Sequence, residues 1–285
     1  MSLISFLKFM LSLCIFLPLN AENFDETHPH VAYCENLTSL SSHDDFVLYT
    51  VPKAGTHLIA VCLHLMTGSS QQFFNEYPFK DPGACQYHLH VLRNQHYFLM
   101  SHDFFSQDMA ELWSICNCKI FLMLRDPRDM TLSMISYIMN GYDVGGWSRN
   151  NWFGQLSLEE QINLTMERIH GCGVEDHYQR RLDWGKMPQS CCIYFENLVG
   201  PKGGGTITAQ LKEMRKIANH IHLQISDKAL LEIGDQMFGH CESQTFHKGA
   251  IGKWKQYFSD ENKQFCKEIL GDLLIELGYE SNYAW

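Results

Sequence analysis

Six consecutive residues, KIFLML at positions 119–124, form an almost uninterrupted apolar run that charged residues follow at once. A run of this length is typical of a β-strand buried on both faces, and such strands occur mostly in parallel sheets that helices cover. Similar short runs stand at 46–51, 97–100 and 191–195, with segments of helical character between them. This alternation predicts an α/β protein with a mainly parallel central sheet flanked by helices.

The composition is that of a globular protein, because the 285 residues are 45% hydrophobic and 19% charged. No internal repeat or Pro/Gly-rich linker divides the chain. We therefore expect a polar lead-in at 22–44 and a single domain at 45–285. The formal net charge of −10 argues against a nucleic-acid-binding surface, which needs clustered Lys and Arg. A few local cations must therefore hold any anionic ligand.

Residues 1–21 are expected to be a targeting segment. Lys8 interrupts the apolar stretch 3–19, and its most hydrophobic part, 9–17, has the length of a signal-peptide core and is short for a membrane-spanning helix. Ala21 suits a cleavage site. The segment predicts export, by secretion or into the lumen of the secretory pathway. The alternative is an uncleaved anchor at 3–19, which alone would bring the protein to a membrane.

The cysteines fit export only weakly. Of the eleven, removal of Cys14 with the signal leaves ten, an even number that allows disulfides in an oxidising compartment. Three others stand in segments that we expect to be buried, where free thiols are common: Cys62, Cys191 and Cys192. Cys116 and Cys118 have no second spaced pair, so no zinc or other metal site is predicted.

A small-residue turn with a lysine, VPKAGTH at 51–57, joins the first apolar run to a helical segment. Such a turn presents backbone N–H groups and a helix N-terminus to a phosphate-like anion. Gly55 allows close approach of the backbone, Lys53 adds a charge, and Thr56 can donate a hydroxyl. The spacing is not the Walker pattern. The alternative interpretation is a tight strand–helix turn with a surface lysine.

Polar residues follow each predicted strand, and the carboxyl ends of parallel strands meet at one edge of a sheet. Four positions outside the turn are involved, including one on the helix after the third strand: His102, Arg125, Ser133 and Glu196. We expect the groups after the strands to converge with the turn on one site that holds two anion-binding features.

These motifs resemble those of the sulfotransferases that use 3′-phosphoadenosine-5′-phosphosulfate (PAPS), of the cytosolic type. PKAGTH at 52–57 is similar to their 5′-phosphosulfate loop, and RDPRD at 125–129 with Ser133 is similar to their 3′-phosphate element. FHKGAIGKWKQYF at 246–258 resembles the segment that closes over the nucleotide, and IYFENL at 193–198 matches the strand between. The resemblance implies a P-loop-like nucleotide-binding architecture with PAPS as co-substrate and no metal.

The resemblance also implies the roles of individual residues. Those expected to bind the co-substrate are Lys53, Ala54, Gly55, Thr56, His57, Arg125, Ser133, Phe195, His247, Lys248, Gly249 and Trp254. Those expected in catalysis are His102 as general base, with Lys53 and Ser133. His88, His90 and Glu196 are the alternatives for the base, although Glu196 is interpreted as a strand-end hydrogen-bonding residue. Trp254 either stacks on the adenine or belongs to the core.

Three positions depart from the family pattern: Ala54 replaces a frequent serine, Phe195 a tyrosine and His247 an arginine. The departures at Phe195 and His247 motivate one alternative function, a catalytically inactive protein that binds PAPS or its product 3′-phosphoadenosine-5′-phosphate (PAP). A nucleotide-dependent kinase or NTPase of related fold is the other. The acceptor is expected to be a hydroxyl of a small molecule, lipid or glycan, in a pocket that 69–95 and 140–155 shape. A poorly kept dimer signature leaves the oligomeric state open.

Overall fold

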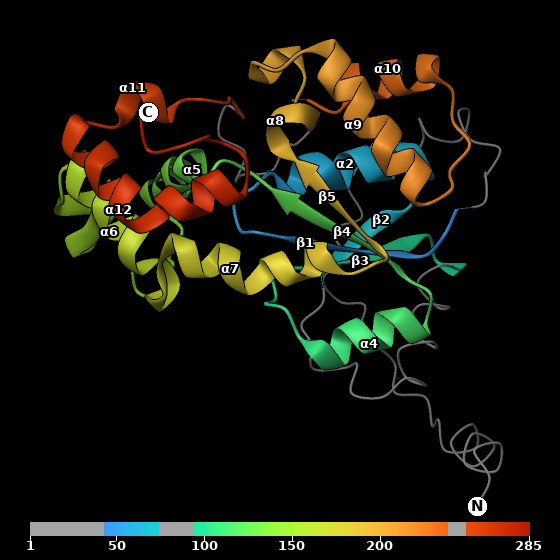
Figure 1. Ribbon diagram of the computed structural model, residues 1–285, viewed down its shortest axis with the longest axis horizontal. Coiled ribbons are helices and arrows are strands. Elements are labelled where there is room, and N and C mark those ends of the chain that lie inside the picture. Colours follow the sequence, from blue (N-terminus) through green and yellow to red (C-terminus); the bar gives the residue numbers. More distant parts are fainter. Residues whose placement is uncertain (1–42, 74–93, 239–248) are drawn as a thin grey trace, which may run out of the picture. The chain divides into compact units, whose positions relative to one another are not determined.

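The computed structural model describes residues 43–73, 94–238 and 249–285 (Figure 1). All of these belong to one compact unit, Thr38–Trp285. The targeting segment 1–21, most of the lead-in and the segment 74–93 lie outside the described residues. So do four residues named above, His88, His90, His247 and Lys248.

The centre of the fold is a five-stranded sheet in the order β2-β3-β1-β4-β5, with every pair parallel. The strands are β1 (Phe46–Thr50), β2 (Ser70–Phe73), β3 (Tyr97–Ser101), β4 (Lys119–Leu124) and β5 (Ser190–Tyr194). The predicted α/β class with a parallel sheet is confirmed. The sequence did not reveal β2, which is short and polar and lies at the edge of the sheet.

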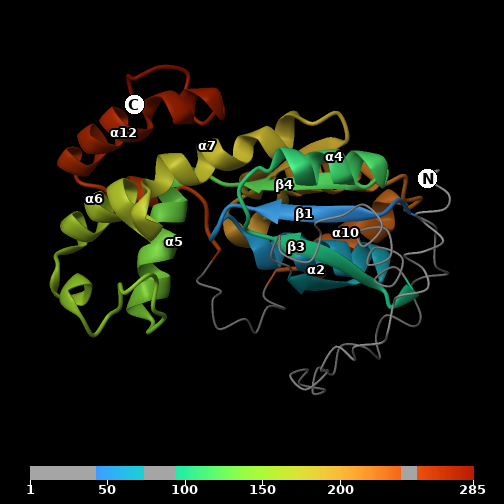
Figure 2. The same ribbon diagram turned by 90° about the horizontal axis from the view of Figure 1, so that it is seen from below.

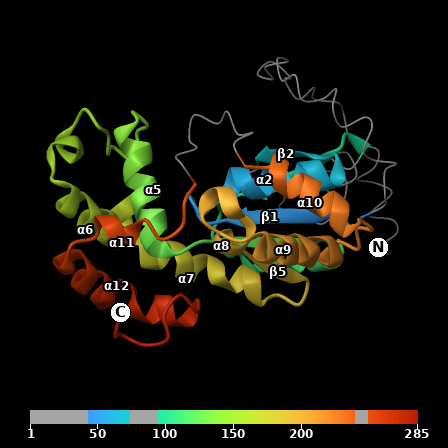
Figure 3. The ribbon, with the colours of Figure 1, turned by 90° about the horizontal axis from the view of Figure 1, so that it is seen from above.

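The helices divide between the two faces of the sheet and the carboxyl ends of its strands. The longer ones are α2 (Thr56–Thr67), α4 (Gln107–Ile115), α5 (Pro127–Met139), α6 (Leu158–Arg168), α7 (Gly173–Lys186), α9 (Ile207–His220), α10 (Asp227–Gln236) and α12 (Asp260–Glu276). Figure 1 shows α2, α9 and α10 on one face, with α4 and α7 on the other. Figure 2 shows α5 and α6 beyond the arrowhead of β1. Figure 3 shows α12 beside α6 and α7, which it contacts.

The burial of the strands follows their place in the sheet. Every residue of β1 is buried, and so is every residue of β4 after Lys119, because both strands are flanked on either side and covered on both faces. β5 was expected to be a buried strand over 191–195, and this was wrong in part. It pairs with β4 alone, so Cys191 and Cys192 are only half-buried. The strand ends at Tyr194, and Phe195 begins the short helix α8 (Phe195–Leu198).

The residues at the helix ends are of the types that commonly begin or end a helix. Gly68 ends α2 in the left-handed conformation at φ 72°. Pro127 opens α5, where its missing N–H costs nothing, and the Asp126 side chain accepts from the N–H of Arg128. Ser157 and Glu160 form a capping box at the start of α6. In the described part of the chain, no helix combines the length and the apolar character needed to span a membrane.

Candidate functional site

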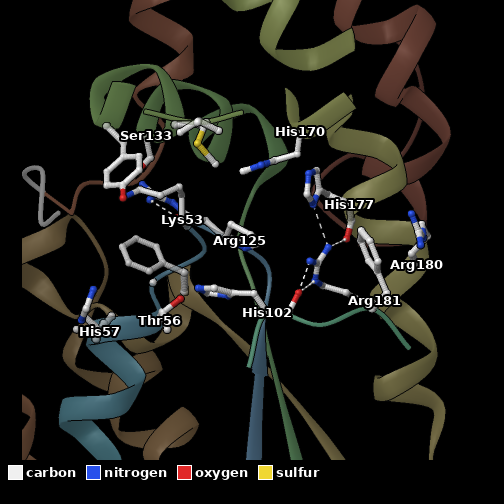
Figure 4. Close-up of a pocket in the computed structure, with 18 of the residues that line it drawn as sticks. Lys53, Thr56, His57, His102, Arg125, Ser133, His170, His177, Arg180 and Arg181 are labelled. Atoms are coloured by element: carbon white, nitrogen blue, oxygen red, sulfur yellow. Dashed lines mark hydrogen bonds between the residues drawn. The ribbon is translucent and has the colours of Figure 1, made fainter. Parts of the chain in front are cut away.

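A cavity of about 700 Å³ opens at the carboxyl ends of β1, β3 and β4 (Figure 4). Nine of the residues that the sequence singled out line it: Lys53, Gly55, Thr56, His57, His102, Arg125, Ser133, Phe195 and Gly249. They come from five separate segments of the chain. The parallel register places these segments together, because it brings the ends of the strands to one edge. Asp143 and Val144, from the segment expected to shape the acceptor pocket, also line the cavity.

The turn after β1 contains two residues in the left-handed region, and a side chain is excluded at one of them, Gly55. Lys53 lies at φ 65° and Gly55 at φ 106°, both in the left-handed region. A Cβ at Gly55 would lie 2.5 Å from Cδ2 of Phe195 and 3.0 Å from Cε of Met123. Helix α2 starts after Gly55 without a side-chain cap. The positive end of its dipole and its first N–H groups therefore face the cavity that Gly55, Thr56 and His57 line.

Lys53 places its charge inside the cavity beside an aromatic ring. Its Nζ lies 4.1 Å from the centroid of the Tyr137 ring. Burial, and after it the nearby Arg125, lowers the pKa of this ammonium to about 8. An anion bound beside Lys53 would stabilise the charged form of this ammonium and raise its pKa again.

Arg125 connects three segments of the site. Its Nη1 donates to the carbonyl oxygen of Lys53 at 3.2 Å and its Nη2 to that of Ala250 at 3.1 Å. The guanidinium lies 4.2 Å from the centroid of the Phe195 ring. The side chain is buried, and its Nε has no hydrogen-bond partner among the residues that the structure describes. Buried N–H groups are normally satisfied, so this donor is available to a ligand.

His102 is held by Thr50 at the end of β1. Its Nδ1 lies 2.8 Å from the Thr50 hydroxyl and 3.1 Å from the Thr50 carbonyl oxygen. A carbonyl oxygen can only accept, so Nδ1 carries the proton and Nε2 is the basic nitrogen. The Thr50 hydroxyl also lies 2.8 Å from that of Thr56, which joins His102 to the anion-binding turn. Burial lowers the pKa of His102, so that the ring is neutral at physiological pH.

Sequence reasoning missed one side of the site. Phe104, His170, Cys172, His177, Arg180 and Arg181 also line the cavity. Arg181 donates from Nε to the carbonyl oxygen of His102 at 3.0 Å and from Nη2 to the same oxygen. The signal that could have found it is the i, i+4 spacing of His177 and Arg181, which places both on one face of α7.

The segment that begins at residue 249 is hydrogen-bonded to the start of α5. The Asp129 carboxylate accepts from the N–H of Gly252 at 2.6 Å and of Trp254 at 3.0 Å. The Trp254 ring is buried and lies 3.7 Å from the guanidinium carbon of Arg128. Trp254 is not among the described lining residues, so its placement fits the core interpretation rather than stacking on a nucleotide. Gly249 does line the cavity.

Two further residues named in the sequence analysis, Ala54 and Glu196, have their side chains engaged within the protein. Ala54 is completely buried in the hydrophobic core and leaves no side chain in the cavity. Glu196 accepts from the N–H of Asp126 at 2.9 Å and from the Tyr279 hydroxyl at 3.0 Å. The interpretation of Glu196 as a strand-end hydrogen-bonding residue is confirmed by these contacts.

Comparison with solved structures finds a fold similar to that of the mouse sulfotransferase SULT7A1, whose crystal structure is a complex with PAP. The two match with a TM-score of 0.57 and 16% sequence identity, over 81% of this chain and 84% of the other. No protein-family model and no curated protein sequence matches the chain. At this identity the likeness shows the fold. The five-stranded parallel sheet flanked by helices is a P-loop-like, sulfotransferase-type architecture.

Proposed function

We propose that the protein is a PAPS-dependent sulfotransferase of the EC 2.8.2 class, which transfers a sulfuryl group to an acceptor hydroxyl. One observation carries the proposal: a single cavity is lined by the turn with Lys53, by Arg125 with Ser133, and by His102. A donor with phosphates at both ends of an adenosine needs two anion sites. Transfer to a hydroxyl needs a base near the reacting end.

The cations and N–H groups of the cavity would form the donor site. Lys53 and the start of α2 would hold the 5′-phosphosulfate, as at other helix N-termini that bind phosphate. Arg125 and the Ser133 hydroxyl would hold the 3′-phosphate, with the buried Nε of Arg125 as one donor. Gly249 would allow the following segment to approach that phosphate. The PAP in the structurally similar mouse enzyme supports a ligand of this class.

The transfer step follows from the same geometry. Nε2 of His102 takes the proton of the acceptor hydroxyl, and the oxygen forms a bond to sulfur. The bond between sulfur and the bridging phosphate oxygen breaks, and its electrons go to the phosphate. Lys53 stabilises the charge that develops on this leaving oxygen. The products are the sulfate ester and PAP, with the proton on His102.

The same residues give less support to two other functions. A kinase or NTPase of related fold would need the Walker spacing, which the turn lacks. An inactive PAPS-binding protein is motivated by Phe195 and His247, two departures from the family pattern. The neutral His102 held by Thr50 argues for a working base instead.

Calorimetry with PAP and with ATP tests the donor assignment. We expect PAP to bind at least tenfold more tightly than ATP, and equal or tighter binding of ATP would contradict the proposal. Transfer from labelled PAPS to a panel of hydroxyl acceptors tests the reaction, with His102→Ala as the comparison. Donor binding without turnover on any acceptor would favour the binding protein. An alanine variant as active as the wild type would contradict the assignment of His102 as the base.

Export of the protein is part of the proposal. It predicts a mature chain that starts after residue 21, outside the cell or in the secretory pathway. N-terminal sequencing of the protein from expressing cells distinguishes this from an anchor retained at 3–19. An intact N-terminus in a membrane fraction would identify the anchor.

A further inference from the structure

A second group of polar side chains lines the cavity, and the proposed donor site uses none of them. This arginine–histidine cluster consists of His170, His177, Arg180 and Arg181. Figure 4 shows the cluster on one side of His102, with Lys53 and Ser133 on the other. The base of the proposed reaction thus stands between the donor side and the cluster, where an acceptor would have to lie.

Arg181 is a buried cation without an anionic partner. Its side chain is 3% exposed, and it forms no ion pair with any residue in 43–73, 94–238 or 249–285. Its four hydrogen bonds go to neutral acceptors: two to the His102 carbonyl oxygen, one to the His177 carbonyl oxygen and one to Nδ1 of His177. A guanidinium has five N–H donors, so one is left for a ligand.

The neighbouring carboxylates are engaged elsewhere. Asp103 accepts from the Ser101 hydroxyl at 2.5 Å, and Asp176 pairs with Arg180 at 3.5 Å. Asp143 lines the cavity but is exposed, and it accepts from the N–H of Gly146. Burial lowers the pKa of Arg181 to about 10, and the nearby Asp103 carboxylate, which raises this pKa, offsets the effect of burial only in part.

Phe104 holds both guanidinium groups at the edge of the cavity. Its ring centroid lies 3.5 Å from the guanidinium carbon of Arg180 and 4.3 Å from that of Arg181. These cation–π contacts relieve part of the cost of the buried charge and fix the planes of the two groups. A bound anion would supply the compensation that the protein itself does not, because buried charges are normally paired.

We infer that the acceptor carries an anionic group, such as a carboxylate, that binds the arginine–histidine cluster while its hydroxyl faces Nε2 of His102. The inference rests on the proposed function and adds the class of the acceptor. With a net charge of −10, the protein as a whole repels such a molecule. Its recognition must therefore come from local cations. Because Arg181 also binds the carbonyl oxygen of His102, the same side chain positions the base and the acceptor.

The test uses matched acceptors that differ only in charge, titrated into the PAP-saturated protein by calorimetry, so that no turnover is needed. The pairs are 4-hydroxyphenylacetate with 4-hydroxyphenylacetamide, and methyl β-D-glucuronide with methyl β-D-glucoside. We expect the carboxylate of at least one pair to bind tenfold or more tightly than its neutral partner. Equal affinities, tighter binding of the neutral members, or binding of neither carboxylate overturns the inference.

Variants assign the preference to the cluster. Arg181→Met should abolish it and Arg181→Lys should keep part of it, while the exposed Arg180→Gln should reduce it severalfold. Lys228→Gln is the matched control, because it removes one positive charge on α10 from a residue that does not line the cavity. A preference that survives both Arg180→Gln and Arg181→Met would contradict the assignment, and circular dichroism checks that each variant folds.

The same titrations separate the two proposals. If PAP binds and the neutral acceptors are preferred, only the anionic class of the acceptor is wrong. If PAP does not bind, the proposed function fails and the acceptor inference fails with it.

Discussion

Arg125 donates from Nη1 to the carbonyl oxygen of Lys53 at 3.2 Å, although the two residues lie 72 positions apart. This bond joins the turn after β1 to the segment after β4. Each segment carries one of the two proposed anion-binding features. The distance between the two features is therefore set by a direct contact and not by the flexibility of either loop.

We expect Arg125→Lys to weaken PAP binding by about tenfold or more. Lysine keeps the charge but lacks the planar fork whose Nη1 and Nη2 each reach one carbonyl oxygen, and a hydrogen bond from a charged group contributes about 1.5–3 kcal/mol. Calorimetry with PAP measures the loss. The control is Arg168→Lys, an exposed substitution on α6 whose partner is the adjacent Glu167. Equal losses in both variants would show that Arg125 has no special role.

Gly55→Ala should reduce PAP affinity at least tenfold. The added Cβ would meet the Phe195 ring at 2.5 Å, and φ 106° is strained for any L residue. Gly68→Ala separates the two causes, since Gly68 has φ 72° but no atom within 4 Å of the added Cβ. It should lower the free energy of unfolding by about 1 kcal/mol and leave PAP binding unchanged. Unchanged PAP binding by Gly55→Ala would refute the proposed approach of this turn to the donor.

Thr50→Val tests how His102 is positioned. It removes the hydroxyl 2.8 Å from Nδ1 and leaves the Thr50 carbonyl oxygen in place. We expect kcat to fall about five- to tenfold with little change in KM, because one hydrogen bond is worth about 1 kcal/mol. Thr67→Val, at the far end of α2, removes a buried hydroxyl that bonds the Leu63 carbonyl oxygen and should leave kcat unchanged. A rise in KM alone would assign Thr50 to substrate binding.

The pH dependence of kcat/KM should show two limbs. Burial lowers the pKa of His102, so the neutral, basic form persists on acidification and activity falls only below the usual histidine range near pH 6.5. Lys53, with a pKa of about 8, loses its charge as the pH rises, so activity falls on the alkaline side near pH 8. Lys53→Arg should remove the alkaline limb. An alkaline limb unchanged in that variant would assign it to another group.

The positions of the strands could be predicted because each central strand is a continuous apolar run. The run 119–124 coincides with β4, and 97–100 differs from β3 by one residue. The prediction was weaker at the edge, where β5 is half-buried and β2 is polar. An edge strand has one neighbour and less cover, so burial selects its residues less strongly. The convergence of Lys53, His102 and Arg125 was also predictable, since parallel strands end at one edge.

Other features of the site depend on contacts between distant segments. No local pattern indicates that Arg181 reaches the carbonyl oxygen of His102, 79 residues away, or that Trp254 packs on Arg128. The sequence by itself determined the central strands, the tight turn after β1 and the candidate base, because burial on two faces and tight turns restrict residue type locally. Only the tertiary structure decided which cations line the cavity without an anionic partner, because that depends on side chains which the fold brings together from separate helices and strands.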